Sequence, residues 1–266
     1  MPRSNRPHAP TELPSDASRA PGALLLMLEA RAFCEAGALI ATLPWLRRLP
    51  RGDGHPVLVF PGLSASDLST RPLRGLLDRL GYATQGWGQG MNRGPRSGVL
   101  ARGAADLRAL AESHGRPVSL VGWSLGGLYA RELAKTLPEH TRCVVTLGTP
   151  FTGDPRANNA WRAFRWLSGQ GAPDPTLLRS LREPPPRPTT SIYSRSDGIV
   201  SWRCSLNEPT ALAENIEVPA SHLGMGLNPL ALYALADRLA QAPDGWAPFE
   251  AKGARRWFFR TGSAAR

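Results

Sequence analysis

One serine lies between two glycines, in the pattern Gly122-x-Ser124-x-Gly126, where an apolar run that begins at Val118 gives way to a helix-forming stretch. A strand that turns so sharply into a helix strains the backbone of the serine, needs small neighbours, and lifts the hydroxyl above the sheet. The backbone N–H of Leu125 then lies at a helix N-terminus, where developing negative charge is stabilised. The pattern therefore predicts a nucleophilic serine, with a plain glycine-rich turn as the alternative.

A nucleophilic serine needs an imidazole that takes its proton and returns it to the leaving group. Among the five histidines, His222 follows the last predicted strand and precedes the last predicted helix. That position is the carboxyl edge of the sheet, where open α/β sheets place their sites. We therefore predict that His222 is the general base. The other histidines lie in the N-terminal tail, before a strand or at helix ends: His8, His55, His114 and His140.

Two aspartates are candidates for the acid that orients the imidazole. Asp197 follows a predicted strand over residues 190–193, and Asp154 follows the strand before it. Each also fits a turn, because a glycine follows the first and a proline follows the second. A carboxylate at either position would hold the tautomer of His222 and stabilise its imidazolium. Spacing alone leaves both positions open.

The elements that would position these residues alternate regularly from residue 55 onwards. Short apolar runs of the β type are separated by helical patterns, two of which end at a glycine that supplies a left-handed cap. Alternating strands and helices indicate βαβ units, so the predicted fold class is α/β, with a mostly parallel central sheet and helices on both faces. The expected strands span residues 57–60, 83–85, 118–121, 143–147, 190–193 and 216–218, and the expected helices residues 68–80, 99–114, 125–137 and 229–241.

This arrangement resembles the α/β-hydrolase superfamily, closest to bacterial lipase/esterase-like members. Besides the serine turn, the resemblance rests on the first strand with Pro61-Gly62-Leu63, on Gly86-Trp-Gly-Gln-Gly90 and on Leu147-Gly-Thr-Pro-Phe151, and it covers residues 55–241. It implies serine, acid and histidine in chain order, with the acid after the strand at 190–193, which favours Asp197; some related hydrolases take the acid from the position of Asp154 instead. It also implies an oxyanion hole made partly by the loop after the first strand. Many members carry His-Gly there, whereas this chain has Pro-Gly, and the N–H would be that of Leu63.

About forty residues separate the predicted strands that end at 147 and begin at 190. Because a long insertion in a compact domain is usually functional, we expect a small helical cap over residues 150–189, with an aromatic helix near 157–167. The glycines at 86, 88 and 90 lack the spacing of a nucleotide-binding loop, so a phosphate cradle is not expected. The predicted pocket residues are aromatic or apolar: Trp87, Met91, Trp123, Phe151, Trp161 and Phe164.

The ends of the chain differ from the hydrolase-like domain at 55–243. Residues 1–21 are rich in Pro and Arg and are predicted to be disordered, and residues 244–266 are expected to form a peripheral extension. Residues 22–54 are expected to form an amphipathic helix that packs on the domain, followed by a linker. Their apolar run is interrupted by Glu29 and Arg31 and is shorter than the about 20 residues of a membrane span. A membrane-surface helix through residues 22–43 is the alternative.

Charge and cysteine usage limit the partners. The formal charge is +11, yet 30 of the 32 basic residues are arginines, most of them scattered, and neither zinc-finger spacing nor an RNA-binding aromatic motif is present. We therefore expect no nucleic-acid partner. The three cysteines form no disulfide framework or zinc pattern, so a reducing, cytoplasmic location is expected.

Together these patterns predict an enzyme without cofactor or metal that cleaves a hydrophobic carboxylic ester. Ser124 would be the nucleophile, His222 the base and Asp197 its orienting acid, while Leu63 and Leu125 would form the oxyanion hole. The same residues would also serve an acyltransferase or a thioesterase. A catalytically silent hydrolase fold used for binding is the alternative from another class.

Overall fold

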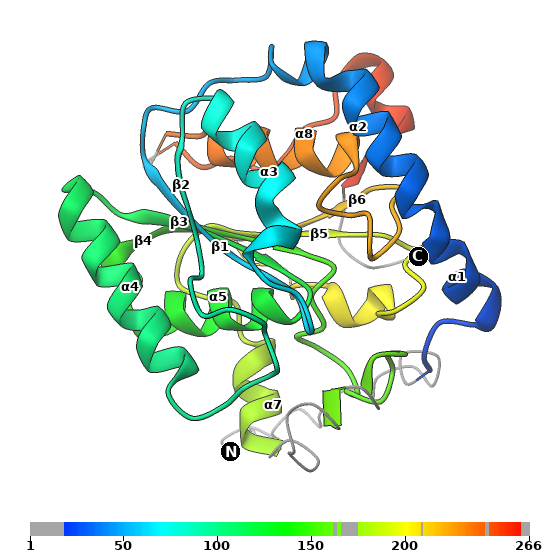
Figure 1. Cartoon of the computed structure of the whole chain (residues 1–266), viewed down its shortest axis with the longest axis horizontal. Coiled ribbons are helices and arrows are strands. Elements are labelled where there is room, and N and C mark those ends of the chain that lie inside the picture. Colours follow the sequence, from blue (N-terminus) through cyan, green and yellow to red (C-terminus); the bar gives the residue numbers. More distant parts are fainter. Residues whose placement is uncertain (1–18, 162–163, 166–174, 209, 243–244, 262–266) are drawn as a thin grey trace, which may run out of the picture.

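The computed structural model describes residues 19–161, 164–165, 175–208, 210–242 and 245–261. One seven-stranded sheet runs through the molecule in the order β2-β1-β3-β4-β5-β6-β7 (Figure 1). All neighbouring strands are parallel except β6 and β7, which are antiparallel. The predicted α/β fold class is therefore confirmed.

Each predicted strand is present, within three residues at either end. The observed strands are β1 (Pro56–Phe60), β2 (Ala83–Gly86), β3 (Val118–Trp123), β4 (Thr141–Leu147), β5 (Thr189–Tyr193), β6 (Ala213–Glu217) and the short β7 (Arg260–Thr261). The central strands are buried on both faces, which is why they appear in the sequence as continuous apolar runs rather than as alternating patterns.

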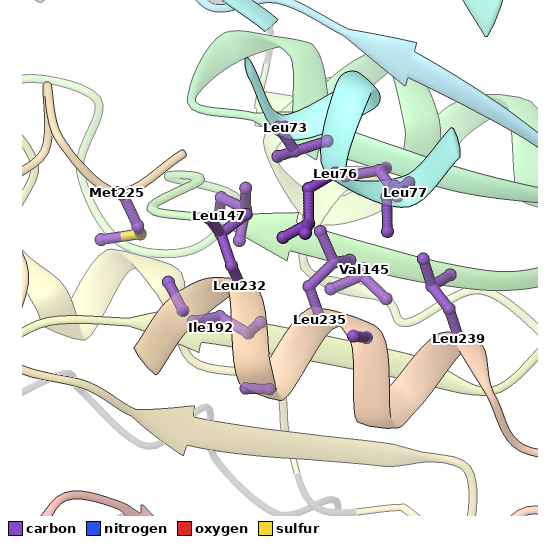
Figure 2. Close-up of a cluster of buried hydrophobic side chains, with 14 of the residues drawn as sticks. Leu73, Leu76, Leu77, Val145, Leu147, Ile192, Met225, Leu232, Leu235 and Leu239 are labelled. Carbon is purple, nitrogen blue, oxygen red and sulfur yellow. The ribbon is translucent and has the colours of Figure 1, made fainter. Parts of the chain in front are cut away.

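Helices cover both faces of the sheet. On one face lie α3 (Asp67–Arg79) and α8 (Pro229–Leu239), and on the other lie α4 (Val99–His114) and α5 (Leu125–Thr136) (Figure 1). Successive strand residues point to opposite faces. Val57 and Val59 of β1 accordingly pack in the core beneath α3 and α8, part of which Figure 2 shows, whereas Leu58 and Phe60 pack beneath α4 and α5.

The ends of the helices follow the expected local chemistry. The side chain of Asn228 caps α8 by accepting the N–H groups of Leu230 and Ala231 at 2.9 and 3.3 Å, and Pro229 occupies the first helical position. At the C-terminal end of α4, Gly115 caps the helix in a left-handed conformation with φ of 61°.

The N-terminal helical segment has an unusual polarity. Three consecutive elements, α1 (Ala23–Met27), the 3-10 helix η2 (Leu28–Arg31) and α2 (Ala32–Leu46), follow one edge of the molecule (Figure 1). Glu29 and Glu35 are only 4% and 8% exposed, whereas Met27 and Phe33 are 76% and 85% exposed. The acidic groups therefore face the protein and large apolar groups face outward, the reverse of an ordinary surface helix.

No helix in the described parts of the chain is both long enough and apolar enough to cross a membrane.

The C-terminal segment is more integrated than predicted. Phe249 and Phe259 are buried in the core cluster beside Tyr233 of α8, and β7 pairs with β6. Within the described residues 245–261, two buried aromatic residues therefore anchor the expected extension to the core, while most of its other residues are exposed. These aromatic residues lack the periodicity of a helix or strand, which is the signal on which the sequence interpretation depended.

The insertion between β4 and β5 is described only in part, because residues 162–163 and 166–174 of the predicted cap lie outside the described residues. Its last helix, α7 (Pro175–Arg182), was not predicted. The buried guanidinium of Arg131 fastens the end of α7 to α5: it donates to the carbonyls of Leu181 and Glu183 at 3.3 and 3.1 Å. Burial lowers the pKa of Arg131 to about 9.

Candidate active site

The serine turn has the strained geometry that its sequence predicts. Ser124 has φ of 54° and ψ of −123°, and it joins the end of β3 to the start of α5. A side chain at Gly122 would collide with the backbone of Gly127, and one at Gly126 would collide with the carbonyl of Phe60. Both flanking glycines are therefore required by close backbone packing, and the plain-turn alternative does not account for the strain at the serine.

The structure brings the three predicted catalytic side chains together. Ser124 Oγ lies 2.9 Å from His222 Nε2, and His222 Nδ1 lies 2.7 Å from Asp197 Oδ2. The three residues follow β3, β6 and β5, so they meet at the carboxyl edge of the sheet. Gly148, with φ of 56°, packs beside them: a Cβ there would lie 3.1 Å from His222 Nδ1 and 3.2 Å from Asp197 Oδ2.

The local hydrogen bonds of the two aspartates distinguish them. Oδ1 of Asp197 accepts the N–H groups of Ile199 and Val200 at 2.8 and 2.7 Å, which leaves Oδ2 directed at His222. Asp154 instead accepts the N–H of Arg156 at 2.8 Å within its own turn. The geometry therefore favours Asp197 as the partner of the imidazole.

The environment of His222 favours its charged form. Burial lowers the pKa of His222, but the charge and hydrogen bond of Asp197, together with the charge of Glu29, outweigh that effect and raise it above its ordinary value. An imidazole with this pKa can accept the serine proton and is stabilised once it has done so.

A second Ser–His–Asp chain exists at the opposite edge of the sheet. His55 Nδ1 lies 2.5 Å from Asp53 Oδ1, and His55 Nε2 lies 2.9 Å from Ser119 Oγ. Ser119 is completely buried inside β3, and burial lowers the pKa of His55 to about 4. Connectivity alone therefore does not make a reactive site; this cluster has no access for a substrate and serves to satisfy buried polar groups.

The loop after β1 lies directly against the serine. A Cβ at Gly62 would lie 3.2 Å from Ser124 Cβ, so the backbone of this loop passes close to the hydroxyl. Leu125 is the first residue of α5, so its N–H needs no partner within the helix. The assignment of the N–H groups of Leu63 and Leu125 to an oxyanion hole remains a prediction.

Asn92 supports this loop and was missed in the sequence. The side-chain NH2 of Asn92 donates to the carbonyl of Pro61 at 2.8 Å, and the backbone carbonyl of Asn92 accepts the N–H of Ser64 at 2.7 Å. The side-chain oxygen also accepts the hydroxyl of Tyr129 at 3.2 Å. Asn92 thus holds the loop that follows β1. Asn92 is fully buried, but in the sequence it appears only as an asparagine in a glycine-rich loop, which does not indicate burial.

Asp67 explains Gly86, the first of the glycines that precede Asn92. Its carboxylate accepts the N–H groups of Trp87 and Gly88 at 3.0 and 3.1 Å, and a side chain at Gly86 would collide with it. The loop is thus fastened to the start of α3, with its backbone N–H groups turned toward a protein carboxylate. This agrees with the expectation that it is not a phosphate cradle.

The predicted pocket residues fall into different environments. Trp87 is 3% exposed and stacks on Tyr129 with 6.2 Å between the ring centroids. Phe151 is buried, and the guanidinium carbon of Arg131 lies 3.8 Å from the centroid of its ring. These core contacts disagree with a pocket-lining function for Trp87 and Phe151. The sequence does not separate the two functions, because aromatic residues near a site also fill the core.

The remaining four pocket residues keep their assignment as predictions. Half-buried Trp123 donates from Nε1 to the carbonyl of His222 at 3.1 Å, and Met91 is exposed. Trp161 and Phe164 stack on one another in the described part of the insertion, with 5.7 Å between their ring centroids.

Across the described ranges, no group of three His, Cys, Asp or Glu side chains could hold a metal ion. No curated protein sequence matches this chain.

Known families and structures agree with the fold. Residues 54–263 match the Alpha/beta hydrolase family. The structure is similar to Aspergillus fumigatus lipase B (TM-score 0.58, 21% identity); the alignment covers 74% of this chain and 54% of that one, so this chain spans about half the length of that lipase. It is also similar to Bacillus licheniformis lipase BlEst2 (TM-score 0.52, 18% identity), with 71% of this chain and 92% of that one covered. A third similar structure is the monoacylglycerol lipase of Paleococcus ferrophilus (TM-score 0.52, 16% identity), with 72% of this chain and 96% of that one covered.

A parallel sheet with a strained serine at the β3–α5 turn and a histidine after a later strand defines the class of the molecule. The chain belongs to the α/β-hydrolase family. At the identities found, the likeness to the individual lipases concerns the fold.

Proposed function

We propose that the protein hydrolyses carboxylic esters that carry a hydrophobic group, through an acyl-enzyme on Ser124. The observation that carries this proposal is the hydrogen-bonded chain from Ser124 through His222 to Asp197, set at a strained turn beside the loop at Gly62. The N–H groups of Leu63 and Leu125 are expected to form the oxyanion site beside the same hydroxyl.

The proposed reaction has two halves. Ser124 Oγ attacks the acyl carbon while its proton passes to His222 Nε2, and the N–H groups of Leu63 and Leu125 bind the resulting oxyanion. The C–O bond to the alcohol then breaks, and His222 returns the proton to the departing oxygen. Water deprotonated by His222 next attacks the acyl-enzyme and releases the acid and free Ser124. Each oxyanion donor is expected to lower the barrier by about 3 kcal/mol.

The hydrophobic part of the substrate is inferred from the stacked pair Trp161 and Phe164 in the insertion. Three similar structures are described as lipases, which supports an ester of this kind. The same residues would also serve an acyltransferase or thioesterase. Adding a competing alcohol to the assay separates these: a hydrolase gives free acid, whereas an acyltransferase gives a new ester.

The direct test is turnover of p-nitrophenyl esters with acyl chains of increasing length. We expect the wild type to turn over these esters and Ser124→Ala to lose several orders of magnitude in kcat. Ser119→Ala is the matched control, because it removes the serine from the second Ser–His–Asp chain and is expected to keep turnover. A well-folded wild type that cleaves none of the esters would favour the silent binding protein.

We further propose that the outward face of residues 22–43 docks on an anionic lipid surface. Glu29, Arg31 and Glu35 are the only charged residues between 22 and 46, and the two acidic groups point inward. Exposed Arg47 and Arg48 follow directly at the end of α2, where they would face lipid phosphates. An apolar helix face with basic residues at one end fits the boundary between acyl chains and head groups.

Co-sedimentation with phosphatidylglycerol vesicles tests this docking. The double variant Phe33→Ser with Ile40→Ser is expected to lose binding, and Leu68→Ser, which removes an exposed leucine from α3, is expected to keep it. Equal binding by all three proteins would contradict the proposal. A wild-type dimer that the double variant converts to a monomer would instead assign this face to a second copy of the chain.

The cysteines Cys34, Cys143 and Cys204 are all free. This fits the reducing compartment expected from the sequence, and we propose a cytoplasmic location.

A further inference from the structure

A buried carboxylate from the N-terminal segment joins the two loops that carry the acid and the base. Oε1 of Glu29 accepts the N–H of Gly198 at 2.7 Å and the N–H of His222 at 3.0 Å. Its Oε2 accepts the N–H of Leu223 at 2.8 Å. Gly198 directly follows Asp197, so one side chain fixes the backbone beside the acid and the backbone of the base itself.

The contact is long-range in sequence, and its carboxylate comes from a residue outside the family match. Glu29 is separated from Gly198 by 169 positions and from His222 by 193, and the match to the α/β-hydrolase family begins at residue 54. The hydrolase-like core therefore does not by itself supply the group that holds these two loops together.

Neighbouring residues strengthen the same junction. The guanidinium of Arg31 donates to the carbonyl of Ser196 and to the carbonyl of Ala220, both at 2.7 Å, and so bridges the same two loops. Glu35 accepts the N–H and the hydroxyl of Ser221 at 2.8 and 2.6 Å.

Two glycines make room for this close packing. A side chain at Gly198 would collide with the carbonyl of Leu25, and one at Gly224 would collide with the carboxylate of Glu35. Both loops are therefore shaped to receive the N-terminal segment, which is what a fixed junction requires.

We propose that Glu29 is a positioning residue for the ester hydrolysis proposed above: its carboxylate holds the Asp197 loop and the His222 loop in register, and its negative charge favours the imidazolium that forms when Ser124 is deprotonated. This inference rests on the proposed function, because it assigns Glu29 to the same reaction.

The electrostatic part follows from the groups around the imidazole. Asp197 faces Nδ1 and Ser124 faces Nε2, while Glu29 approaches from η2. Arg31 and Glu35 contact the adjacent residues of the loop rather than His222. The charge of Glu29 raises the pKa of His222, in addition to the larger effects of burial, which lowers it, and of Asp197, which raises it. Removing that charge is therefore expected to lower the pKa of His222.

The test compares Glu29→Gln, Glu29→Asp and Glu35→Gln with the wild type. Glu35→Gln is the matched control, because it also removes a buried carboxylate that binds the His222 loop from the same helical segment. The measurements are the rate of fluorophosphonate labelling of Ser124 against pH, the NMR titration of His222, assigned with His222→Gln, and thermal unfolding.

Glu29→Gln is expected to lower the plateau labelling rate roughly tenfold or more, because small displacements of catalytic groups are costly. It should also move the acidic limb of the profile and the His222 titration to lower pH, since neutral imidazole is the active form. Glu29→Asp keeps the charge with a shorter reach, so the plateau should fall while the limb stays near that of the wild type. Glu35→Gln should leave the limb in place.

The inference would be overturned if all variants lost activity only in proportion to their loss of stability, with the same His222 titration. If Glu29→Gln does not fold, a wild-type plateau in Glu29→Asp overturns it. A wild type that is not labelled contradicts the proposed function instead, and the NMR titration then still decides whether Glu29 acts on His222.

Discussion

The indole N–H of Trp123 donates to the backbone carbonyl of His222 at 3.1 Å. The residue before the serine therefore holds the backbone of the histidine, and the ring also packs against Gly226, where an added Cβ would lie 2.7 Å from it. The backbone of His222 is thus held from two directions: by Trp123 from the β3 side and by Glu29 from the N-terminal segment.

Replacing Trp123 with Phe tests the first of these contacts. The variant keeps an aromatic ring but loses the hydrogen bond, which is expected to cost about 1 kcal/mol of stability and to lower kcat several-fold. Steady-state kinetics with a p-nitrophenyl ester, beside thermal unfolding, measures both. An unchanged kcat would show that the hydrogen bond does not position His222.

Gly148→Ala is expected to reduce activity far more than stability alone explains. A Cβ there would press on His222 Nδ1 and Asp197 Oδ2 at 3.1 and 3.2 Å, and φ of 56° adds about 1–2 kcal/mol of backbone strain for a residue with a side chain. Gly115→Ala is the matched control: φ there is 61°, and nothing lies within 4 Å of the added Cβ.

Both glycine variants should unfold at similar, slightly lowered temperatures, while only Gly148→Ala loses turnover. Equal turnover by the two variants would mean that the contact at Gly148 does not constrain the reactive groups.

The rate should depend on pH through His222. Its pKa is raised above the ordinary value of 6.5, and the neutral imidazole accepts the serine proton, so kcat/KM is expected to fall as the pH drops through a limb centred above 6.5. Asp197→Asn removes the charge that raises this pKa, so its limb should lie at lower pH and its kcat should fall by about 10⁴. A rate that stays flat from pH 8 to 5 would exclude His222 as the base.

Asn92→Ala tests the support of the predicted oxyanion loop. The variant loses the hydrogen bonds to Pro61 and Tyr129, which is expected to cost about 1–3 kcal/mol of stability. If the loop at Leu63 supplies an oxyanion donor, kcat should fall roughly 10-fold or more while KM changes little, because the donor acts on the transition state. A kcat that falls only with the folded fraction would remove Leu63 from the proposed oxyanion hole.

Much of the fold follows from local sequence signals. The order of strands and helices is visible because the strands are short apolar runs and the helices begin or end at residues with capping chemistry. Asn228 caps the start of α8, and Gly115 caps the end of α4. Ser124 and His222 are likewise marked by their places at strand ends. Parallel strands bring such positions to one edge whatever their separation in the chain.

The residues that hold the site were not predictable in the same way. Glu29 appears in the sequence only as an interruption of an apolar run, and its contacts with Gly198 and His222 depend on how the N-terminal segment docks. Asn92 acts through the backbone of a loop about thirty residues away. Phe249 and Phe259 join the core through tertiary packing without any periodic pattern. Long-range contacts of this kind leave no local signal.

The proposed function requires Ser124 to be an activated nucleophile. Intact-mass measurement after treatment with a fluorophosphonate probe tests it most directly, with wild type, Ser124→Ala and Ser119→Ala in parallel. We expect one adduct on the wild type and on Ser119→Ala, mapped to the peptide that contains Ser124, and none on Ser124→Ala. An adduct that persists in Ser124→Ala, or a folded wild type that takes up no probe, would contradict it.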